Sequence, residues 1–370
     1  MTQIITPVMG AFTPVKYSLK LVELLYNDTL YPFITNTDYE GQIKEAGDRV
    51  KVRTAGKISL STYTKGMQLV KQELTPTSED LIIDQMQYFS FGVDDVDKMQ
   101  NDINAIDEYA KNTKRDMAEV LDTDILSYGR KNVQFANVVG SSYSVGTVTI
   151  TVTTGAVVGS GTTFTAGMVG GVLKATGHSD AQGYLVTAFS STTSITVKNL
   201  GSTTTYSGGA ITDATYEIKG ATALAVTKDN IYAKLVEVRT VLGQALCPKE
   251  GRFVVMNSQA EGVLLQAPEF IPAVQSAYNG VVEKGLLGSI AGFKIFSSEL
   301  VDGDNTTGYW FLAGTKDFIA FATQISQVSV IPASTDPNSF ISTCKGLLVW
   351  GRMVFAGNRA RGAVLRATLS

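Results

Sequence analysis

Few side chains in this sequence have the types and spacing that nucleophilic or acid–base catalysis requires. The only histidine is His178, which stands beside Ser179 and Asp180 in a turn-rich stretch. A catalytic triad needs a nucleophile, a base and an acid that meet in space from separate positions, which three consecutive residues do not do. We therefore interpret His178 as a surface-loop residue, expect no catalytic residues, and predict that the protein is not an enzyme.

The sequence also contains few residues that could bind a metal ion. The two cysteines, Cys247 and Cys344, are far apart in the sequence, and both lie in apolar surroundings. One histidine and two distant cysteines do not provide the ligand set of a zinc site. Buried free thiols are favoured over a disulfide in a protein made in a reducing compartment. We predict no metal-binding residues, no cofactor-binding residues and no cofactor.

The remaining candidates for chemistry have structural interpretations. The glycine-rich run at Gly159–Phe164 lacks the Lys-Ser/Thr ending of a phosphate loop and does not open a helix, so a β-turn is favoured. Asp94 and Asp95 are interpreted as helix N-caps, and Asp122 and Asp124 as part of a solvated helix face.

Charge argues against nucleic-acid or membrane binding. The net charge is −3, which creates no field that attracts either polyanion. A mild basic cluster of Arg352, Arg359, Arg361 and Arg366 is expected to pair with acidic neighbours. The chain has no run of eighteen apolar residues, and its first twelve residues are interrupted by polar residues and a proline. We expect a soluble protein made in the cytoplasm.

One long helix is the clearest element that positions the rest. Apolar or small residues recur three or four positions apart at Val96, Met99, Ile103, Ile106, Ala110, Met117 and Val120. This spacing predicts a single helix with a narrow buried stripe, from Asp94 to a stop at Gly129. About thirty-five residues at ~1.5 Å each give a rod of roughly 50 Å. Such a rod spans a surface more than it fills a core.

Before the helix, residues 41–88 are predicted to form an extended two-stranded loop. Its expected pieces are Val50–Arg53, Lys57–Ser61, a tip at Thr64–Gly66, Glu73–Thr75 and Ile82–Asp84. A hairpin with polar residues on both faces is marginal alone, so it needs a partner surface. Residues 1–40 are predicted to form an N-terminal arm with a short helix near Ser18–Asn27.

Residues 138–219 change sharply in composition. Between Val133 and Ile218 only five residues are Asp, Glu, Lys or Arg. Strands are predicted at Gly146–Thr153, Gly171–Ala175, Gly183–Phe189, Ser194–Lys198 and Thr215–Ile218. Their regular spacing favours a small all-β domain inserted into the chain over a low-complexity linker.

Residues 220–338 mix helices and strands without strict alternation, which favours α+β over a doubly wound sheet. A helix at Thr227–Leu246, capped by Thr227 or Asp229, has the stripe Ile231, Leu235, Val238 and Leu242, and a second, capped by Ser258, runs to Leu265. Strands are predicted at Arg252–Met256, Ile290–Ser297, Trp310–Ala313, Phe318–Phe321 and Val328–Ile331, then in the closing residues 339–370 at Leu347–Phe355 and Ala363–Leu369.

This order of elements resembles the layout of tailed-phage major capsid proteins with the Hong Kong 97 fold. The stretches similar to that family are Phe89–Asp97, Arg252–Ser258, Gln266–Phe270, Gly288–Phe296 (G-x-I-x-G-F), Ala320–Ala322, Gln327–Val330 and Gly346–Gly351. The resemblance covers most of the chain outside residues 138–219, which resemble small β-domains of other virion proteins at Val157–Phe164, Ser194–Val197 and Tyr206–Ala210.

The resemblance implies an α+β fold with six parts. They are an N-terminal arm (1–40), an extended loop (41–88), a peripheral domain with the spine helix (89–137), an inserted β-domain (138–219), an axial α/β domain (220–338) and closing strands (339–370). It also implies self-assembly, as hexamers and pentamers, into an icosahedral shell that encloses double-stranded DNA in the virion. Assembly is expected in the host cytoplasm, with a portal, without a membrane, and with arm and loop overlapping adjacent subunits.

Two details of the family need separate readings here. Some members cross-link a loop lysine, and Lys57, Lys65 and Lys71 lie in the matching region, but solvated lysines are favoured. We expect no scaffolding segment before the arm, and therefore a separate scaffolding protein.

Three alternatives to a capsid protein remain open. They are a tail or surface protein whose β-domain binds glycans, a protein nanocompartment, and a coiled-coil oligomer.

Overall fold

The computed structural model describes residues 30–39, 49–54, 58, 60–69, 71–72, 77–94, 105–152, 154–177, 182–200, 206, 209–268, 286–331 and 341–370. Most of the predicted arm, the cap Asp95 and His178 lie outside these residues. The chain divides into two compact units. The first contains residues 1–22, 37–107 and 320–357, and the second contains residues 23–36, 108–319 and 358–370.

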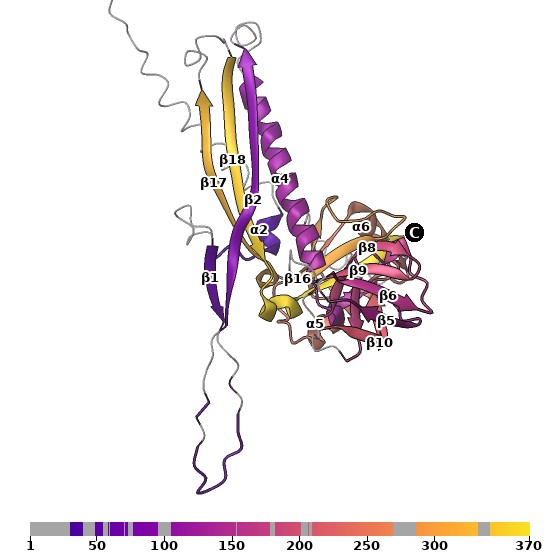
Figure 1. Cartoon of the computed structure of the whole chain (residues 1–370). Coiled ribbons are helices and arrows are strands. Elements are labelled where there is room, and N and C mark those ends of the chain that lie inside the picture. The colour runs from indigo at the N-terminus through magenta and orange to yellow at the C-terminus, as the bar shows by residue number, and fades with distance from the viewer. Residues whose placement is uncertain are drawn as a thin grey trace, which may run out of the picture. The chain divides into compact units, whose positions relative to one another are not determined.

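The first unit is built on a four-stranded antiparallel sheet in the order β1-β2-β18-β17 (Figure 1). Its strands are β1 (Arg49–Thr54), β2 (Thr77–Asp94), β17 (Ala320–Ile331) and β18 (Ile341–Met353). The three long strands run side by side, and β1 pairs with the first residues of β2, from Arg49↔Ile82 to Thr54↔Thr77. Leu81, Ala320, Ala322 and Phe355 form a small buried core beneath them.

Several predictions for this unit are wrong in detail. Asp94 ends strand β2 instead of capping a helix, and the predicted boundary at residue 88 falls inside that strand. The described residues of the predicted strand Lys57–Ser61 are not in a strand. Residues 320–331 form one strand in place of two short ones. The two closing strands do not pair with each other, since β18 joins this sheet and the last strand joins another.

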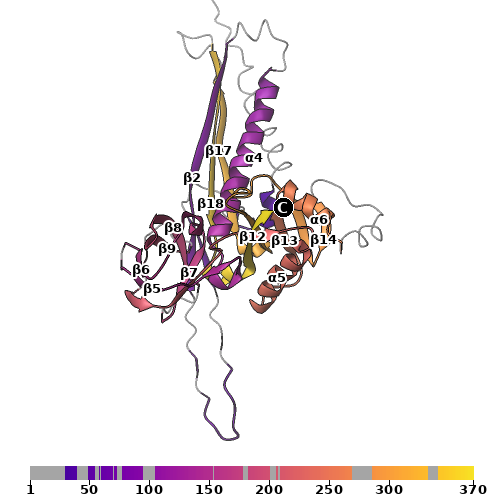
Figure 2. The same cartoon turned by 90° about the vertical axis from the view of Figure 1, so that its right-hand side faces the viewer.

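The second unit contains a seven-stranded sheet in the order β12-β19-β16-β13-β15-β14, with β3 also paired to β19. The strands are β3 (Val138–Val139), β12 (Leu224–Val226), β13 (Arg252–Met256), β14 (Leu286–Ile290), β15 (Phe293–Ser297), β16 (Tyr309–Thr315) and β19 (Gly362–Leu369). Helices α5 (Ile231–Gln244) and α6 (Ser258–Leu265) lie beside it (Figure 2). The predicted stripe of Ile231, Leu235, Val238 and Leu242 is buried, as expected for a helix packed on a sheet.

The N-caps of these two helices and the bounds of one strand differ from the predicted ones. The side chain of Asn257, not Ser258, caps α6 by accepting the Ala260 N–H at 3.0 Å. Neither Thr227 nor Asp229 caps α5, whose N-cap position is Asn230 without a side-chain cap bond. The predicted strand Ile290–Ser297 is the turn and second strand of a hairpin formed by β14 and β15.

An eight-stranded sheet occupies most of the segment predicted as an insertion, in the order β10-β5-β6-β9-β8-β7-β11-β4. Its strands are β4 (Ser142–Tyr143), β5 (Thr147–Ile150), β6 (Ala156–Ser160), β7 (Val172–Ala175), β8 (Tyr184–Ser191), β9 (Ser194–Asn199), β10 (Ile211–Ala214) and β11 (Tyr216–Lys219). All five predicted strands are present, and β4, β6 and β10 were not predicted. The sheet has its own buried cluster, which includes Phe164, Tyr184, Ile195 and Ile218.

The long helix is α4 (Ala105–Lys131), so the predicted helix is confirmed over this range. Gly129 does not stop it, because the helix continues to Lys131. A Cβ at Gly129 would lie 2.7 Å from Ile319 Cδ1 and 2.9 Å from Leu312 Cδ2, so this glycine permits close packing. The buried stripe near the helix end is Ala118, Leu121, Ile125 and Leu126, whereas the predicted Met117 and Val120 are only half-buried.

The short helices complete the described elements. They are α2 (Tyr31–Ile34) and the 3₁₀ turns η3 (Phe135–Asn137), η4 (Ala166–Met168), η5 (Lys316–Phe318) and η7 (Ala356–Arg361). None of the described helices is both long and apolar enough to cross a bilayer.

Candidate functional site

The residues first considered for chemistry are dispersed. Cys247 is buried, Cys344 is half-buried, and both are free thiols, as predicted. Burial raises the pKa of both thiols, which keeps them protonated and unreactive at neutral pH. Over the described part of the chain, no three His, Cys, Asp or Glu side chains gather as metal ligands would. Gly161 follows β6 with a φ of +69°, which agrees with the predicted turn.

The tip of the extended loop carries an unexpected number of exposed apolar side chains. Its turn is as predicted, since the Met67 N–H donates to the Thr64 carbonyl at 3.0 Å and Gly66 has a φ of +91°. The exposed apolar residues beside this turn are Ile58, Leu60, Tyr63, Met67 and Leu69. Leu60 is 98% exposed and Leu69 is 80% exposed. Solvated loops do not normally display such a group, so the tip is a candidate contact surface.

The loop is also basic. Residues 55–72 contain three lysines and no acidic residue. Of these lysines, Lys65 and Lys71 are exposed, while Lys57 lies outside the described residues. The exposure of Lys65 and Lys71 agrees with the solvated side chains predicted for this loop. The tip therefore combines apolar and positively charged groups.

A second apolar surface lies on one face of the four-stranded sheet. Met86 and Tyr88 are exposed on the same face of β2, because every second residue of a strand points to the same face. Met86 is paired with Val349 and Tyr88 with Leu347, and both partners are half-buried. These four residues form the sheet-face strip. Asp84 is exposed two residues before Met86 and adds a negative charge there.

Arg366 holds the root of the eight-stranded sheet. It is 3% exposed, and its guanidinium donates to the carbonyls of Gly167 and Gly220 at 2.6 Å each, and to that of Thr307 at 2.6 Å. A further bond reaches the carbonyl of Ala221 at 3.3 Å. Burial lowers the pKa of Arg366 to about 10, so the side chain stays charged at neutral pH.

Trp310 links Arg366 to the long helix. The guanidinium carbons of Arg366 and Arg130 lie 4.7 and 4.8 Å from the Trp310 ring centre, which is within cation–π range. Arg130, in the last turn of α4, donates to Asp302 at 2.7 Å. The end of the helix, strand β16 and the root of the eight-stranded sheet therefore share one network.

Two other members of the predicted basic cluster have different kinds of partner. Arg361 pairs with Asp317, as expected for a residue with acidic neighbours. Arg359 instead donates to the Leu200 carbonyl at 2.8 Å and to the Gln182 side chain. Arg359 and Arg366 thus bind carbonyl and amide oxygens of the eight-stranded sheet, which the sequence did not predict.

The two ends of the eight-stranded sheet meet. A Cβ on Gly140 would lie 2.8 Å from Gly220 Cα, and the Thr222 N–H donates to Ser141 Oγ at 2.7 Å. The chain therefore enters and leaves this segment at one place.

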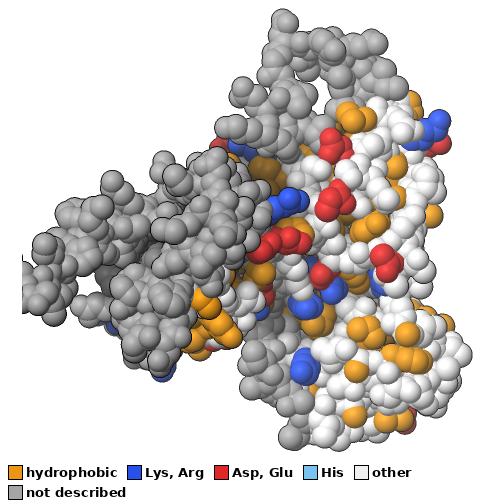
Figure 3. Space-filling view, turned by 90° about the horizontal axis from the view of Figure 1, so that it is seen from above, with side chains coloured by type: hydrophobic (Ala, Val, Ile, Leu, Met, Phe, Trp, Pro, Cys, Tyr) orange, Lys and Arg blue, Asp and Glu red, His pale blue; other side chains and the backbone are white. Residues whose placement is uncertain are grey.

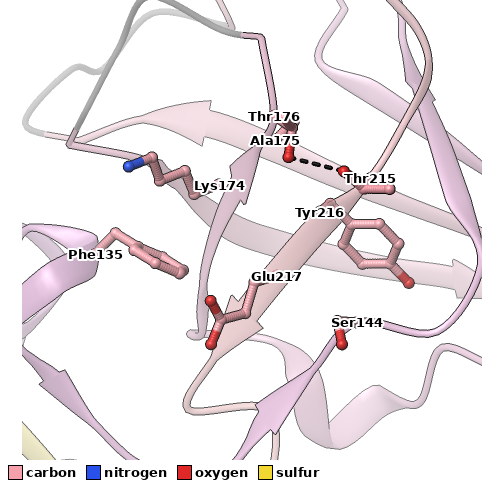
Figure 4. Close-up of a pocket in the computed structure, with 8 residues that line it drawn as sticks. All are labelled: Phe135, Ser144, Lys174, Ala175, Thr176, Thr215, Tyr216 and Glu217. Atoms are coloured by element: carbon pink, nitrogen blue, oxygen red, sulfur yellow. Dashed lines mark hydrogen bonds between the residues drawn. The ribbon is translucent and has the colours of Figure 1, made fainter.

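An open pocket of about 410 Å³ lies between η3 and strands β7 and β11 (Figure 4). Its polar side chains bond mainly to neighbours: Thr215 donates to Thr176 at 2.8 Å, Tyr216 donates to the Val145 carbonyl at 2.7 Å, and Glu217 accepts from Ser142 at 2.6 Å. The pocket has no convergent set of catalytic groups.

On the face drawn in Figure 3, basic and acidic side chains are interspersed, without a large patch of one sign.

Comparisons with known proteins agree with this geometry. A family model described as phage capsid protein matches residues 184–365, just under half of the chain. The match begins at Tyr184, so it includes part of the eight-stranded sheet. No curated protein sequence matches the chain.

Solved structures similar to this chain extend over nearly all of it. A chain of Mycobacterium phage Che8 is 18% identical with a TM-score of 0.56, covering 93% of each chain. The capsid of cyanophage P-SCSP1u is 14% identical with a TM-score of 0.55, covering 100% of this chain and 93% of that one. The capsid of cyanophage Pam1 is 13% identical with a TM-score of 0.53, covering 90% and 89%. At these identities the likeness establishes the fold.

Proposed function

We propose that this chain, which is a tailed-phage major capsid protein with the Hong Kong 97 fold, builds its shell from hexamers and pentamers held together by the extended loop. The fold likeness over 93% of both this chain and the Che8 chain is the observation that carries the proposal. As a structural subunit of the virion, the protein needs contact surfaces in place of an active site. The loop tip and the sheet-face strip supply two of them.

The two surfaces are complementary, which supports contact between copies. The tip has exposed Leu60 and Leu69 beside Lys65, and the strip has Met86 and Tyr88 beside Asp84. Burying one such apolar side chain contributes about 1.5–3 kcal/mol, and a lysine beside an aspartate favours one orientation of the contact. The tip of one subunit is therefore assigned to the strip of a neighbour.

The charge of the chain supports containment of DNA without specific binding. A net charge of −3 gives the shell no general attraction to the phosphate backbone. The proposal includes a separate scaffolding protein, a portal, and assembly in the host cytoplasm. These partners follow from the resemblance of the chain to the capsid family.

Sedimentation velocity of the purified chain, with and without a candidate scaffolding protein, tests self-assembly. We expect a large closed assembly, or a hexamer that converts to it. A chain that remains a monomer or dimer under every assembly condition would contradict the proposal.

We further propose that the eight-stranded sheet is an inserted domain on the outer face of the shell. Its adjoining ends and its scarcity of charged residues support insertion and exposure, since contact with packaged DNA favours basic groups. Antibodies raised against residues 141–217 should then bind intact particles. Binding only to disrupted particles would place the sheet inside.

Excision gives a separate prediction about this sheet. A short Gly/Ser linker in place of Ser141–Glu217 should leave a chain that folds, because its ends already meet. The melting temperature should fall, since Arg359 loses Leu200 and Gln182 and Arg366 loses Gly167. Calorimetry of the shortened chain measures this. An unfolded product would show that the sheet is integral to the core.

A further inference from the structure

A short segment near the N-terminus is fixed to the long helix by one carboxylate. Asp122 of α4 accepts the Leu30 N–H at 2.9 Å through Oδ2 and the Tyr31 N–H at 3.0 Å through Oδ1. These are the first amides of α2, so the carboxylate acts as an N-cap supplied by another helix. Asp122 is only 6% exposed, which contradicts the predicted solvated face.

The rest of the segment is also anchored. Tyr31 and Ile34 are fully buried, and the Asn36 N–H donates to the Ile319 carbonyl at 2.8 Å. The ring centres of Phe33 and Phe296 lie 5.8 Å apart. Residues 30–36, here called the anchor segment, are therefore held within the second unit, and the Asp122 carboxylate accepts two of their backbone N–H groups.

The electrostatic environment of Asp122 is simple. Burial raises its pKa to about 6, and the two N–H donors lower it without offsetting the burial. Among the described residues, no charged side chain contributes to this shift. Two other ionisable groups contact the segment: Lys316 donates to the Pro32 carbonyl, and Asp317 accepts from Asn36 as well as from Arg361. On α4 itself, Glu119 and Asp116 are exposed.

We propose that Asp122 and the anchor segment form a pH-sensitive latch that closes more tightly as the pH falls. The closed latch shields the carboxyl group from water, which penalises the ionised form. Releasing the segment exposes the group and returns it to ordinary hydration. Closing the latch is therefore coupled to uptake of a proton.

The direction and size of the effect follow from the two states. The pKa is about 6 when the latch is closed and about 3.9 when the carboxyl is hydrated. The stabilisation of the closed state is complete below the lower value and is lost as the pH rises through 6. A difference of about two pKa units corresponds to a roughly 100-fold change in the closing equilibrium. This inference concerns the chain's own fold and does not depend on shell assembly.

Hydrogen exchange of the full chain tests the latch. We expect amide protection in residues 30–36, corrected for intrinsic exchange, to increase at least tenfold between pH 7.5 and pH 4.5. Asp122→Asn should remove this pH dependence, because an amide does not titrate. The control Asp116→Asn, at an exposed position on the same helix, should behave as the wild type.

Three results would overturn the latch. They are protection that is constant or that falls on acidification, a pH dependence retained in Asp122→Asn, or one lost in Asp116→Asn. If Asp122→Asn does not fold, the carboxyl carbon shift of Asp122 in the wild-type chain gives the answer by NMR. A midpoint near pH 6 supports the latch, and a midpoint below 4.5 refutes it.

Discussion

Replacing Leu60 and Leu69 together by serine abolishes shell formation and leaves the subunit folded. Both side chains are almost fully exposed, at 98% and 80%, so their loss removes no packing within the subunit. In a shell, each contributes about 1.5–3 kcal/mol where it is buried against a neighbour. Their joint loss, about 3–6 kcal/mol for each contact, raises the critical concentration for assembly more than about 100-fold.

Light scattering during assembly measures this effect, and circular dichroism checks the fold. The matched control changes two polar positions of the same loop, Ser61→Ala and Gln68→Ala, both exposed. The control should assemble at the wild-type concentration. Assembly of the double leucine variant at that same concentration would show that the loop tip does not make the contact between subunits.

Arg366→Ala lowers the free energy of unfolding by about 3–5 kcal/mol, because buried carbonyls lose a charged donor. The affected carbonyls belong to Gly167, Gly220, Ala221 and Thr307. The cation–π contact with Trp310 is lost as well. Arg361→Ala is the control, since Arg361 has a partly exposed ion pair with Asp317. Surface pairs contribute at most about 1 kcal/mol.

Urea unfolding of the unassembled subunit compares the two arginine variants. We expect the free energy of unfolding of the Arg366 variant to be lower than that of the Arg361 variant by at least about 2 kcal/mol. Equal losses would mean that the bonds at the root of the eight-stranded sheet are replaced by water at little cost.

The elements with strong periodic patterns were predictable from sequence. The stripe of α5, the strand Arg252–Met256 and the five strands of the eight-stranded sheet follow from apolar spacing that local structure must satisfy. Strand β4 was missed because its two residues carry no readable period. The free thiols were predictable because the two cysteines are far apart in the sequence and no other cysteine is present.

Residues whose roles depend on distant partners could not be predicted. Asp122 has the spacing of a surface residue, but it is buried and accepts the backbone N–H groups of Leu30 and Tyr31, which are distant in sequence. Gly129 resembles a helix stop, but Ile319 and Leu312 decide its role. The alternation of Ile58 with Leu60, and of Met67 with Leu69, was the available signal for the apolar loop tip. The polar residues between them, Ser59 and Gln68, obscured it.

Electron microscopy of the particles formed by this chain tests the central claim most directly. The account predicts closed icosahedral shells whose reconstruction resolves hexamers and pentamers, with residues 58–69 of each subunit in contact with an adjacent one. Fibres, open sheets or isolated subunits in the presence of the scaffolding protein would contradict it.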